Sequence, residues 1–120
     1  MKIAITSSGK TPDSQMDSRF GRAAAFIVFD TEDDSFTALD NTQNLEAAQG
    51  AGIQAAQHVV NAGARACVSG HTGPKAFKVL SAAGIPVYLA PGGTVADVYQ
   101  AWKKGELKQI SDADVEGHWV

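Results

Sequence analysis

The second half of the chain alternates short apolar stretches with longer stretches of helical period, and this alternation limits the fold more than any other feature. Thr94 and Asp97 have the spacing of a capping box, and Gly84 and Gly105 stand where the two helical stretches should end. Strands are predicted at 65–70 and 85–90, and helices at 72–84 and 94–105. A strand–helix–strand unit forms a right-handed crossover between parallel strands, so we predict a parallel βαβ half.

The first half of the chain predicts an antiparallel arrangement. Three apolar or alternating stretches should be strands, and they cover residues 2–7, 24–30 and 35–40. The polar turn at 31–34 joins the last two as a hairpin, and its acidic side chains should blunt an edge of the sheet. A helix is expected at 50–62, with a buried face formed by Ile53, Ala56 and Val60 and a solvent face formed by Gln54, Gln57, His58 and Asn61.

Together these elements predict one α/β domain over residues 1–105. Its five-stranded mixed sheet combines an antiparallel meander with the parallel βαβ half, and helices flank the sheet to give three layers. Residues 106–120 are polar, end near Trp119, and are expected to form a short strand or a loose tail. One hypothesis for this tail is that it binds a partner protein.

Composition bounds the class of protein. The 120 residues are 44% hydrophobic and 19% charged, as in ordinary globular domains, and the net charge of −3 argues against nonspecific nucleic-acid binding. The single cysteine, Cys67, excludes an internal disulfide and fits a reducing compartment. No signal peptide or membrane-spanning stretch is visible, so we expect a cytoplasmic protein without a membrane partner.

A long loop follows the first strand, from Gly9 to Arg22, and it is locally positive. It carries three cations and two acids, namely Lys10, Arg19 and Arg22 against Asp13 and Asp17. A small domain seldom keeps so many irregular residues between strands without a use for them, which favours an anion-binding loop. A solvated linker whose arginines pair with Asp30 or Asp40 is an equally weighted alternative.

Two glycine-containing turns should lie beside this loop, because parallel strands bring their carboxyl ends to one edge of the sheet. Both turns precede helices, whose free amide N–H groups and dipoles favour anions. The candidate N–H donors are Gly70, His71, Thr72 and Gly73 in one turn and Gly92 and Gly93 in the other.

Several chemistries are excluded by their motifs. Gly9-Lys10-Thr11 lacks the earlier glycine of a P-loop, because position 4 is Ala4, and the first strand has no carboxylate for two-metal nuclease chemistry. Cys67 reads as a buried, inert thiol. His71 is weighed evenly between a binding role, including a metal ligand, and a plain capping role, since isolated histidines cannot form a closed zinc site.

Two motifs carry a family resemblance. Asp17-Ser18-Arg19-Phe20-Gly21-Arg22-Ala23 and Gly70-His71-Thr72-Gly73-Pro74-Lys75-Ala76-Phe77 resemble the signatures of the dinitrogenase iron–molybdenum cofactor biosynthesis family. The resemblance spans about residues 1–103 and implies a ribonuclease-H-like fold without nuclease activity. It also implies a non-enzymatic carrier of metal–sulfur clusters that exchanges its cargo with donor or acceptor proteins.

Among single-domain members the chain looks most like the type that holds a molybdenum–copper sulfide cluster non-covalently; an iron–molybdenum-type cluster is the other expectation. Such clusters are polyanions whose sulfides already saturate the metals, so the protein needs charge, N–H donors and some apolar surface. Lys10, Arg19 and Arg22 would supply the positive charge. Met16, Phe20 and Leu45 would form an apolar rim, and the alternative is that these apolar side chains pack in the core. A protein that binds or senses a phosphorylated small molecule at the same edge is the competing hypothesis.

Overall fold

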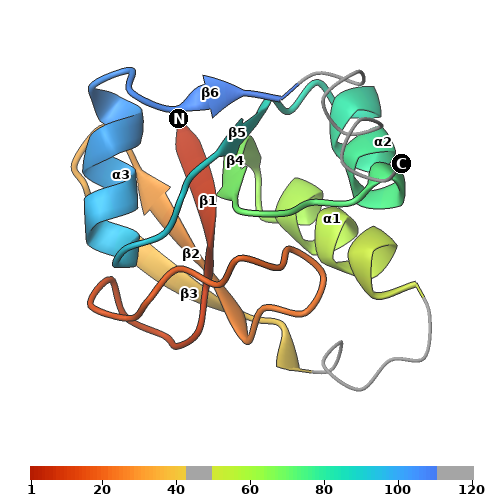
Figure 1. Cartoon of the computed structure of the whole chain (residues 1–120), viewed down its shortest axis with the longest axis horizontal. Helices are drawn as coiled ribbons and strands as arrows, with labels where there is room; N and C mark the ends of the chain where they lie inside the picture. The colour runs from red at the N-terminus through yellow and green to blue at the C-terminus, as the bar shows by residue number, and fades with distance from the viewer. Residues whose placement is uncertain (43–49, 111–120) are drawn as a thin grey trace.

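A computed structural model of the chain describes residues 1–42 and 50–110, which form an α/β fold around a mixed sheet (Figure 1). The strands are β1 (Lys2–Ser7), β2 (Ala25–Asp30), β3 (Phe36–Asp40), β4 (Ala64–Ser69), β5 (Val87–Leu89) and β6 (Lys108–Gln109). The helices are α1 (Ala51–Asn61), α2 (Pro74–Ala82) and α3 (Val95–Lys103). Within these ranges no helix has the length and hydrophobicity that crossing a bilayer requires.

The sheet topology confirms an antiparallel half and a parallel half that share the first strand. The strand order is β3-β2-β1-β4-β5-β6, with β1 antiparallel to β2 and parallel to β4. The antiparallel register pairs Lys2 with Asp30 and Ser7 with Ala25. The α/β class and the mixed sheet are therefore confirmed, while the ribonuclease-H-like assignment stays a prediction.

The predicted number of five strands is wrong, because the sheet has six. The sixth strand pairs antiparallel with β5, with Tyr88 opposite Gln109 and Leu89 opposite Lys108. The sequence left a short strand or a loose tail open over 106–120, because two residues are too short to produce a pattern of period two that would decide between them. The next residue, Ile110, is buried and donates its N–H to the Val87 carbonyl at 2.8 Å.

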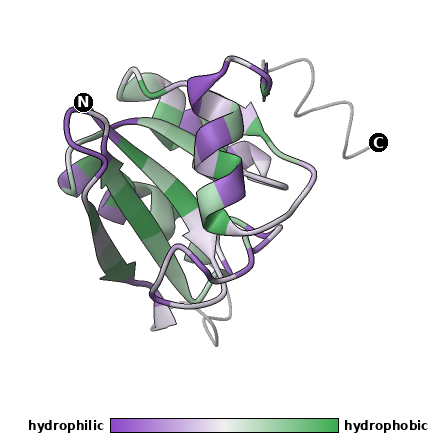
Figure 2. Ribbon diagram, turned by 90° about the vertical axis from the view of Figure 1, so that its left-hand side faces the viewer, coloured by the Kyte–Doolittle hydropathy of each residue, from purple (hydrophilic) through white to green (hydrophobic). Residues whose placement is uncertain are grey.

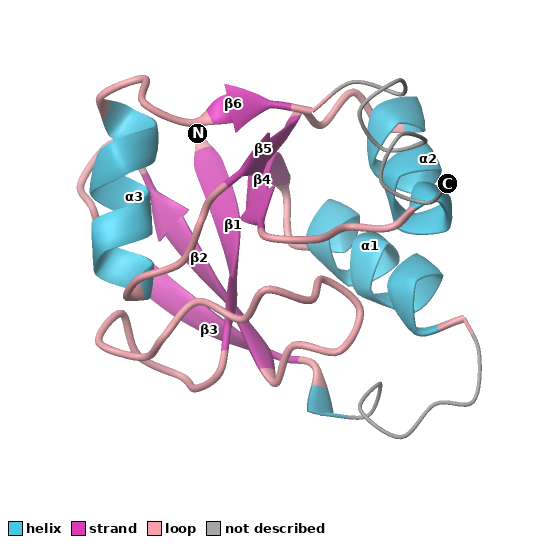
Figure 3. Ribbon diagram, in the orientation of Figure 1, coloured by secondary structure: helices cyan, strands magenta, loops and turns pink. Residues whose placement is uncertain are grey.

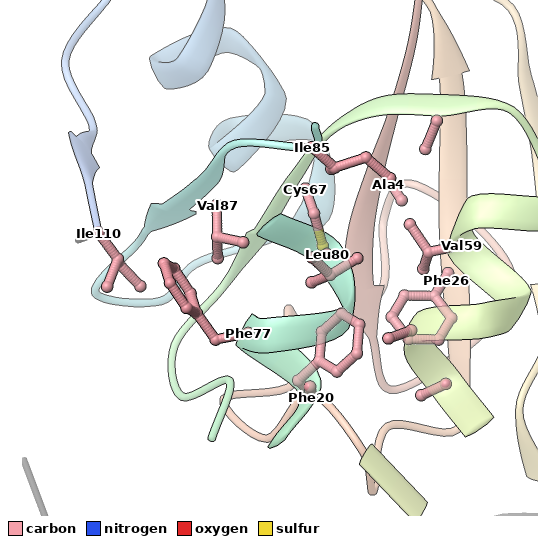
Figure 4. Packing of buried hydrophobic residues seen from close by; sticks show 14 of the residues in the cluster. Ala4, Phe20, Phe26, Val59, Cys67, Phe77, Leu80, Ile85, Val87 and Ile110 are labelled. Atoms are coloured by element: carbon pink, nitrogen blue, oxygen red, sulfur yellow. The ribbon is translucent and has the colours of Figure 1, made fainter. Parts of the chain in front are cut away.

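The two faces of the sheet are covered by different helices, α1 and α2 on one face and α3 on the other (Figures 1 and 3). The strands between them carry many hydrophobic residues, whereas the surrounding loops are largely hydrophilic (Figure 2). Figure 4 shows the cluster below α1 and α2, in which Phe20, Phe26, Val59, Cys67, Phe77 and Leu80 meet. The opposite cluster packs Val95, Val98 and Tyr99 of α3 on the strands.

The buried face predicted for α1 is partly wrong. The helix buries Ala51, Ala55, Ala56 and Val59, whereas Ile53 is 40% exposed. Helices α1 and α2 approach closely, since a Cβ added to Gly52 would lie 3.4 Å from the Cβ of Ala76. At this spacing the alanine stripe fits between the helix and its neighbours, and the larger Ile53 side chain turns toward solvent.

The β2–β3 hairpin is tied to α3 at its tip. Tyr99 Oη donates to Asp34 Oδ1 at 2.6 Å, and Lys103 Nζ donates to the same oxygen at 3.0 Å. The Tyr99 ring also stacks on Phe29, with centroids 3.9 Å apart and planes 2° from parallel. Distant parts of the chain are therefore joined across the α3 face of the sheet.

Candidate functional site

The loop between β1 and β2 crosses the carboxyl edge of the sheet and is held there by backbone hydrogen bonds. Phe20 N donates to His71 O at 2.9 Å, and Met16 N donates to Gly93 O at 2.8 Å. Short bridges also join Arg19 to His71 and Gln15 to Thr94. The predicted meeting of the loop with both glycine-containing turns is therefore confirmed.

Several residues of the Asp17-to-Ala23 motif stabilise the conformation of the loop itself. Asp17 Oδ1 accepts the Arg19 N–H at 2.9 Å and closes a tight turn. The Phe20 ring is 1% exposed and packs 5.1 Å from the Phe26 ring, while Met16 is 8% exposed. The apolar rim predicted from these two side chains is therefore replaced by core packing, the alternative reading; Leu45 lies outside the described residues.

Two glycines of the motifs permit close approaches of backbone to backbone. A Cβ on Gly21 would lie 2.9 Å from Gly52 N at the start of α1, and a Cβ on Gly70 would lie 2.9 Å from Ser18 Cα. Any larger residue would push the loop away from α1 or from the end of β4. These glycines hold the loop against the start of α1 and against the end of β4.

The cations of the loop do not all face the same neighbours. Arg19 is exposed, and its Nε lies 3.3 Å from Asp17 Oδ1, so its partner is neither Asp30 nor Asp40. The pKa of Asp40 is lowered mainly by hydrogen bonding from Thr42, and additionally by the charge of Lys10. Lys10 therefore acts toward the end of β3, and among the described residues no hydrogen bond or ion pair joins it to the turn at 70–73.

The start of α2 is open to a ligand. Its N-cap residue is Gly73, no side chain caps the helix, and its first turn has no acidic residue. Within the described ranges, the amides of Lys75 and Ala76 donate to no other group. Thr72, 8% exposed, holds a buried hydroxyl oxygen that has no hydrogen-bond partner in the part of the chain described. Unpaired buried hydroxyls are rare and point to a missing partner.

Within the part of the chain that the structure describes, helix α1 adds a second start without a side-chain cap beside the first. Its N-cap residue Gly50 offers no side-chain cap, and its first turn has no acid. The contact of Gly52 with Ala76 places the two helix starts side by side, with Gly21 packed on α1. The sequence predicted the helix at 50–62, but its start was not among the candidate anion-binding groups. The signal for it was Gly50, a glycine where Ser, Thr, Asp or Asn would normally cap a helix.

The start of α3 is closed by comparison. Val95 N donates to Ser14 O and Ala96 N to Pro12 O, both at 2.9 Å, and Asp97 N donates to Thr94 Oγ1 at 3.1 Å. This confirms the predicted cap at Thr94. A cavity of about 310 Å³ beside Gly92 is lined in part by the acidic residues Asp97 and Glu106. A binding role for Gly92 and Gly93 stays a prediction, and the carboxylates oppose an anion there.

The donor set suits an anion better than a bare metal ion. Among the described residues, no group of three or more His, Cys, Asp or Glu side chains could hold a metal ion. Cys67 is fully buried, and burial raises the pKa of its thiol to about 12, so the thiol stays protonated at neutral pH. His71 is exposed at the edge of the site, and its role as a metal ligand stays a prediction.

The fold and this edge define a small binding domain, and comparison with known proteins gives its family. Residues 1–105 match the family model described as dinitrogenase iron-molybdenum cofactor, so the chain belongs to this family.

Solved structures that resemble the chain include the apo form of the orange protein from Desulfovibrio gigas. It has a TM-score of 0.88 and 39% identity, with 92% of each chain covered. A NifB-like protein from Thermotoga has a TM-score of 0.80 and 36% identity, with 90% of this chain and 91% of that chain covered. An uncharacterized protein of Methanocaldococcus jannaschii is 25% identical over 112 residues, or 92% of each sequence.

Proposed function

We propose that the chain is a non-catalytic carrier that binds a preassembled metal–sulfide polyanion where the starts of α1 and α2 meet the β1–β2 loop. The observation that carries the proposal is the uncapped start of α2, with free amides next to the unpartnered Thr72 hydroxyl. Membership of the iron–molybdenum cofactor family supports metal–sulfur cargo rather than another anion.

The residues present fit such a cargo. Gly70, Gly73 and Lys75 offer backbone or ammonium N–H groups, and Arg19 and Arg22 belong to the loop that crosses the same edge. Charge-assisted hydrogen bonds contribute about 1.5–3 kcal/mol each, so three would account for about micromolar binding. The helix starts add a favourable field of about 0.3–1 kcal/mol each at an exposed site.

The proposed cargo contains molybdenum, in a molybdenum–copper sulfide or an iron–molybdenum-type cluster. Likeness to the apo orange protein supports the copper-containing alternative, because the resemblance drawn from the motifs implies that cluster for this type. A carrier of this kind would receive the cluster from one protein and pass it to another. It would need no metal ligand of its own, which agrees with the buried Cys67.

The test is to titrate the metal-free protein with tetrathiomolybdate and copper(I) under anaerobic conditions, following the visible absorbance. The wild type should form a tight coloured complex, and the variant Arg19→Ala/Arg22→Ala should bind at least tenfold more weakly. Lys103→Ala/Lys104→Ala is the matched control, because it removes two cations at the far end of α3. Equal affinity of the arginine variant and the wild type would refute the proposed site.

Binding of a phosphorylated small molecule is the second candidate, because uncapped helix starts also suit phosphate. Thermal shift measurements with nucleotides and sugar phosphates separate the two functions. A large rise in Tm with one of these, together with no coloured complex, would favour the second candidate.

A further inference from the structure

The outer edge of β3 is an open strand on the far side of the sheet from β6. Asn41 N donates to Ala24 O, and Asp30 N donates to Ser35 O, which fixes the hydrogen-bonded pairs of the β2–β3 ladder. Such pairs alternate along antiparallel strands. Phe36, Ala38 and Asp40 therefore turn their backbone N–H and C=O groups outward, and no described residue pairs with these groups.

The strand lacks several features that usually protect an edge. It has five residues, contains no proline or lysine, and has no register shift against β2. Its first residue, Phe36, is 46% exposed. The opposite edge is protected, because β6 has two residues and one of them is Lys108. Strand β3 is thus the edge that can accept another strand.

A cleft of about 370 Å³ lies next to this edge. It is lined by Leu39, Asp40, His58, Asn61 and Ala62, and so it runs between β3 and the last turns of α1. The volume lies in the range of ligand pockets, about 300–1,000 Å³. Leu39 and Ala62 are apolar residues of its lining, which suits an aliphatic side chain from a strand paired along β3.

The surroundings of the edge are acidic. Residues 30–42 contain five acids and no lysine or arginine; the acids are Asp30, Glu32, Asp33, Asp34 and Asp40. Hydrogen bonds, from Ser35 to Asp33 and from Thr42 to Asp40, lower the pKa of both carboxyls, which keeps them ionised at neutral pH. Lys103 neutralises Asp34, and Lys10 offsets part of the charge of Asp40.

We infer that the edge of β3 binds an extended basic segment of a partner protein, which adds a seventh strand and inserts one aliphatic side chain into the cleft. Basic residues on this segment would face the acids of the hairpin. A second copy of the chain fits less well, because pairing β3 with β3 would place two acidic hairpins together. This surface is separate from the anion site, so the inference does not rest on the proposed cargo.

The test uses the full-length protein and a synthetic peptide of alternating lysine and aliphatic residues, followed by amide NMR shifts. We expect salt-sensitive shifts centred on Phe36, Ala38, Asp40 and the cleft residue Ala62. A glutamate peptide with the same aliphatic residues should bind at least tenfold more weakly. The same lysine peptide, N-methylated at alternate amides, should lose binding without any change to the protein.

Variants of the protein give the second arm. Ala38→Pro removes an outward N–H but no bond to β2, so it should fold and bind the peptide at least tenfold more weakly. Ala38→Val is the matched control and should bind like the wild type. Shifts confined to another surface, equal binding of the glutamate or N-methylated peptide, or self-association through residues 36–40 would each overturn the inference.

Discussion

Helices α2 and α3 begin at the same edge of the sheet, but among the described residues only α3 has acceptors for the amides of its first turn. Pro12, Ser14 and Thr94 accept the first amides of α3, and Asp97 adds a negative charge. The start of α2 has a glycine cap, and in residues 1–42 and 50–110 its first amides and the buried Thr72 hydroxyl have no partner. A helix start is therefore a candidate binding site when its first amides lack acceptors within the protein. The presence of a helix start alone is not enough.

The largest expected effect concerns Phe20, whose buried ring anchors the β1–β2 loop in the cluster with α1 and α2. Phe20→Ala removes a buried ring of the loop and should lower the free energy of unfolding by about 3–5 kcal/mol. Urea denaturation measures it, with the exposed Phe36→Ala as the control. A loss below about 1 kcal/mol would mean that the loop holds its position without this anchor.

The next effect should distinguish the two helices by charge. Lys75→Glu places an acid in the first turn of α2 and should weaken tetrathiomolybdate–copper binding by about tenfold or more. Lys104→Glu changes the net charge equally at the far end of α3 and should have little effect. Equal losses in both variants, measured by absorbance titration at one ionic strength, would show that only net charge matters.

Two substitutions of threonine should have opposite effects on stability. Thr94→Ala removes the cap of α3 and should lower the free energy of unfolding by about 1 kcal/mol without changing anion affinity. Thr72→Val removes an unpartnered buried hydroxyl and should raise it by about 1 kcal/mol, while it weakens anion binding. Destabilisation by Thr72→Val, measured by urea denaturation, would show that the Thr72 hydroxyl does have a hydrogen-bond partner in the folded protein.

The smallest effect is a pH dependence at the other end of α3. Hydrogen bonds from Tyr99 and then Lys103 lower the pKa of Asp34 below its usual 3.8. Since the folded pKa is the lower one, this stabilisation is complete above about pH 4 and is lost as pH falls through the folded value. Asp34→Asn keeps the shape and suits the φ of 61° at this position. The Tm difference between the wild type and this variant should therefore shrink between pH 4 and pH 2.

Sequence reasoning recovered the elements whose signals are local. The alternation of apolar and helical stretches predicted the α/β class, and the spacing of Thr94 and Asp97 predicted the cap of α3. Strand β6 was left open between a short strand and a loose tail because two residues carry no period, and the buried face of α1 was misplaced because alanines carry little hydrophobic signal. Those features depend on packing partners that are distant in the chain.

The candidate site was predictable in its location and less so in its composition. Motif spacing and the crossover rule brought the loop to the turn at His71, as the bond from Phe20 N to His71 O shows. The burial of Phe20, the pairing of Arg19 with Asp17 and the position of Lys10 near Asp40 depend on side-chain directions. No pattern along the sequence gives those directions.

The sealed position of Cys67 in β4 has a consequence for how cargo would leave. A cluster held only by N–H groups and cations departs without any exchange of ligands at its metals. Its release would then respond to competing anions and ionic strength, and would be indifferent to alkylating reagents that cannot reach the thiol.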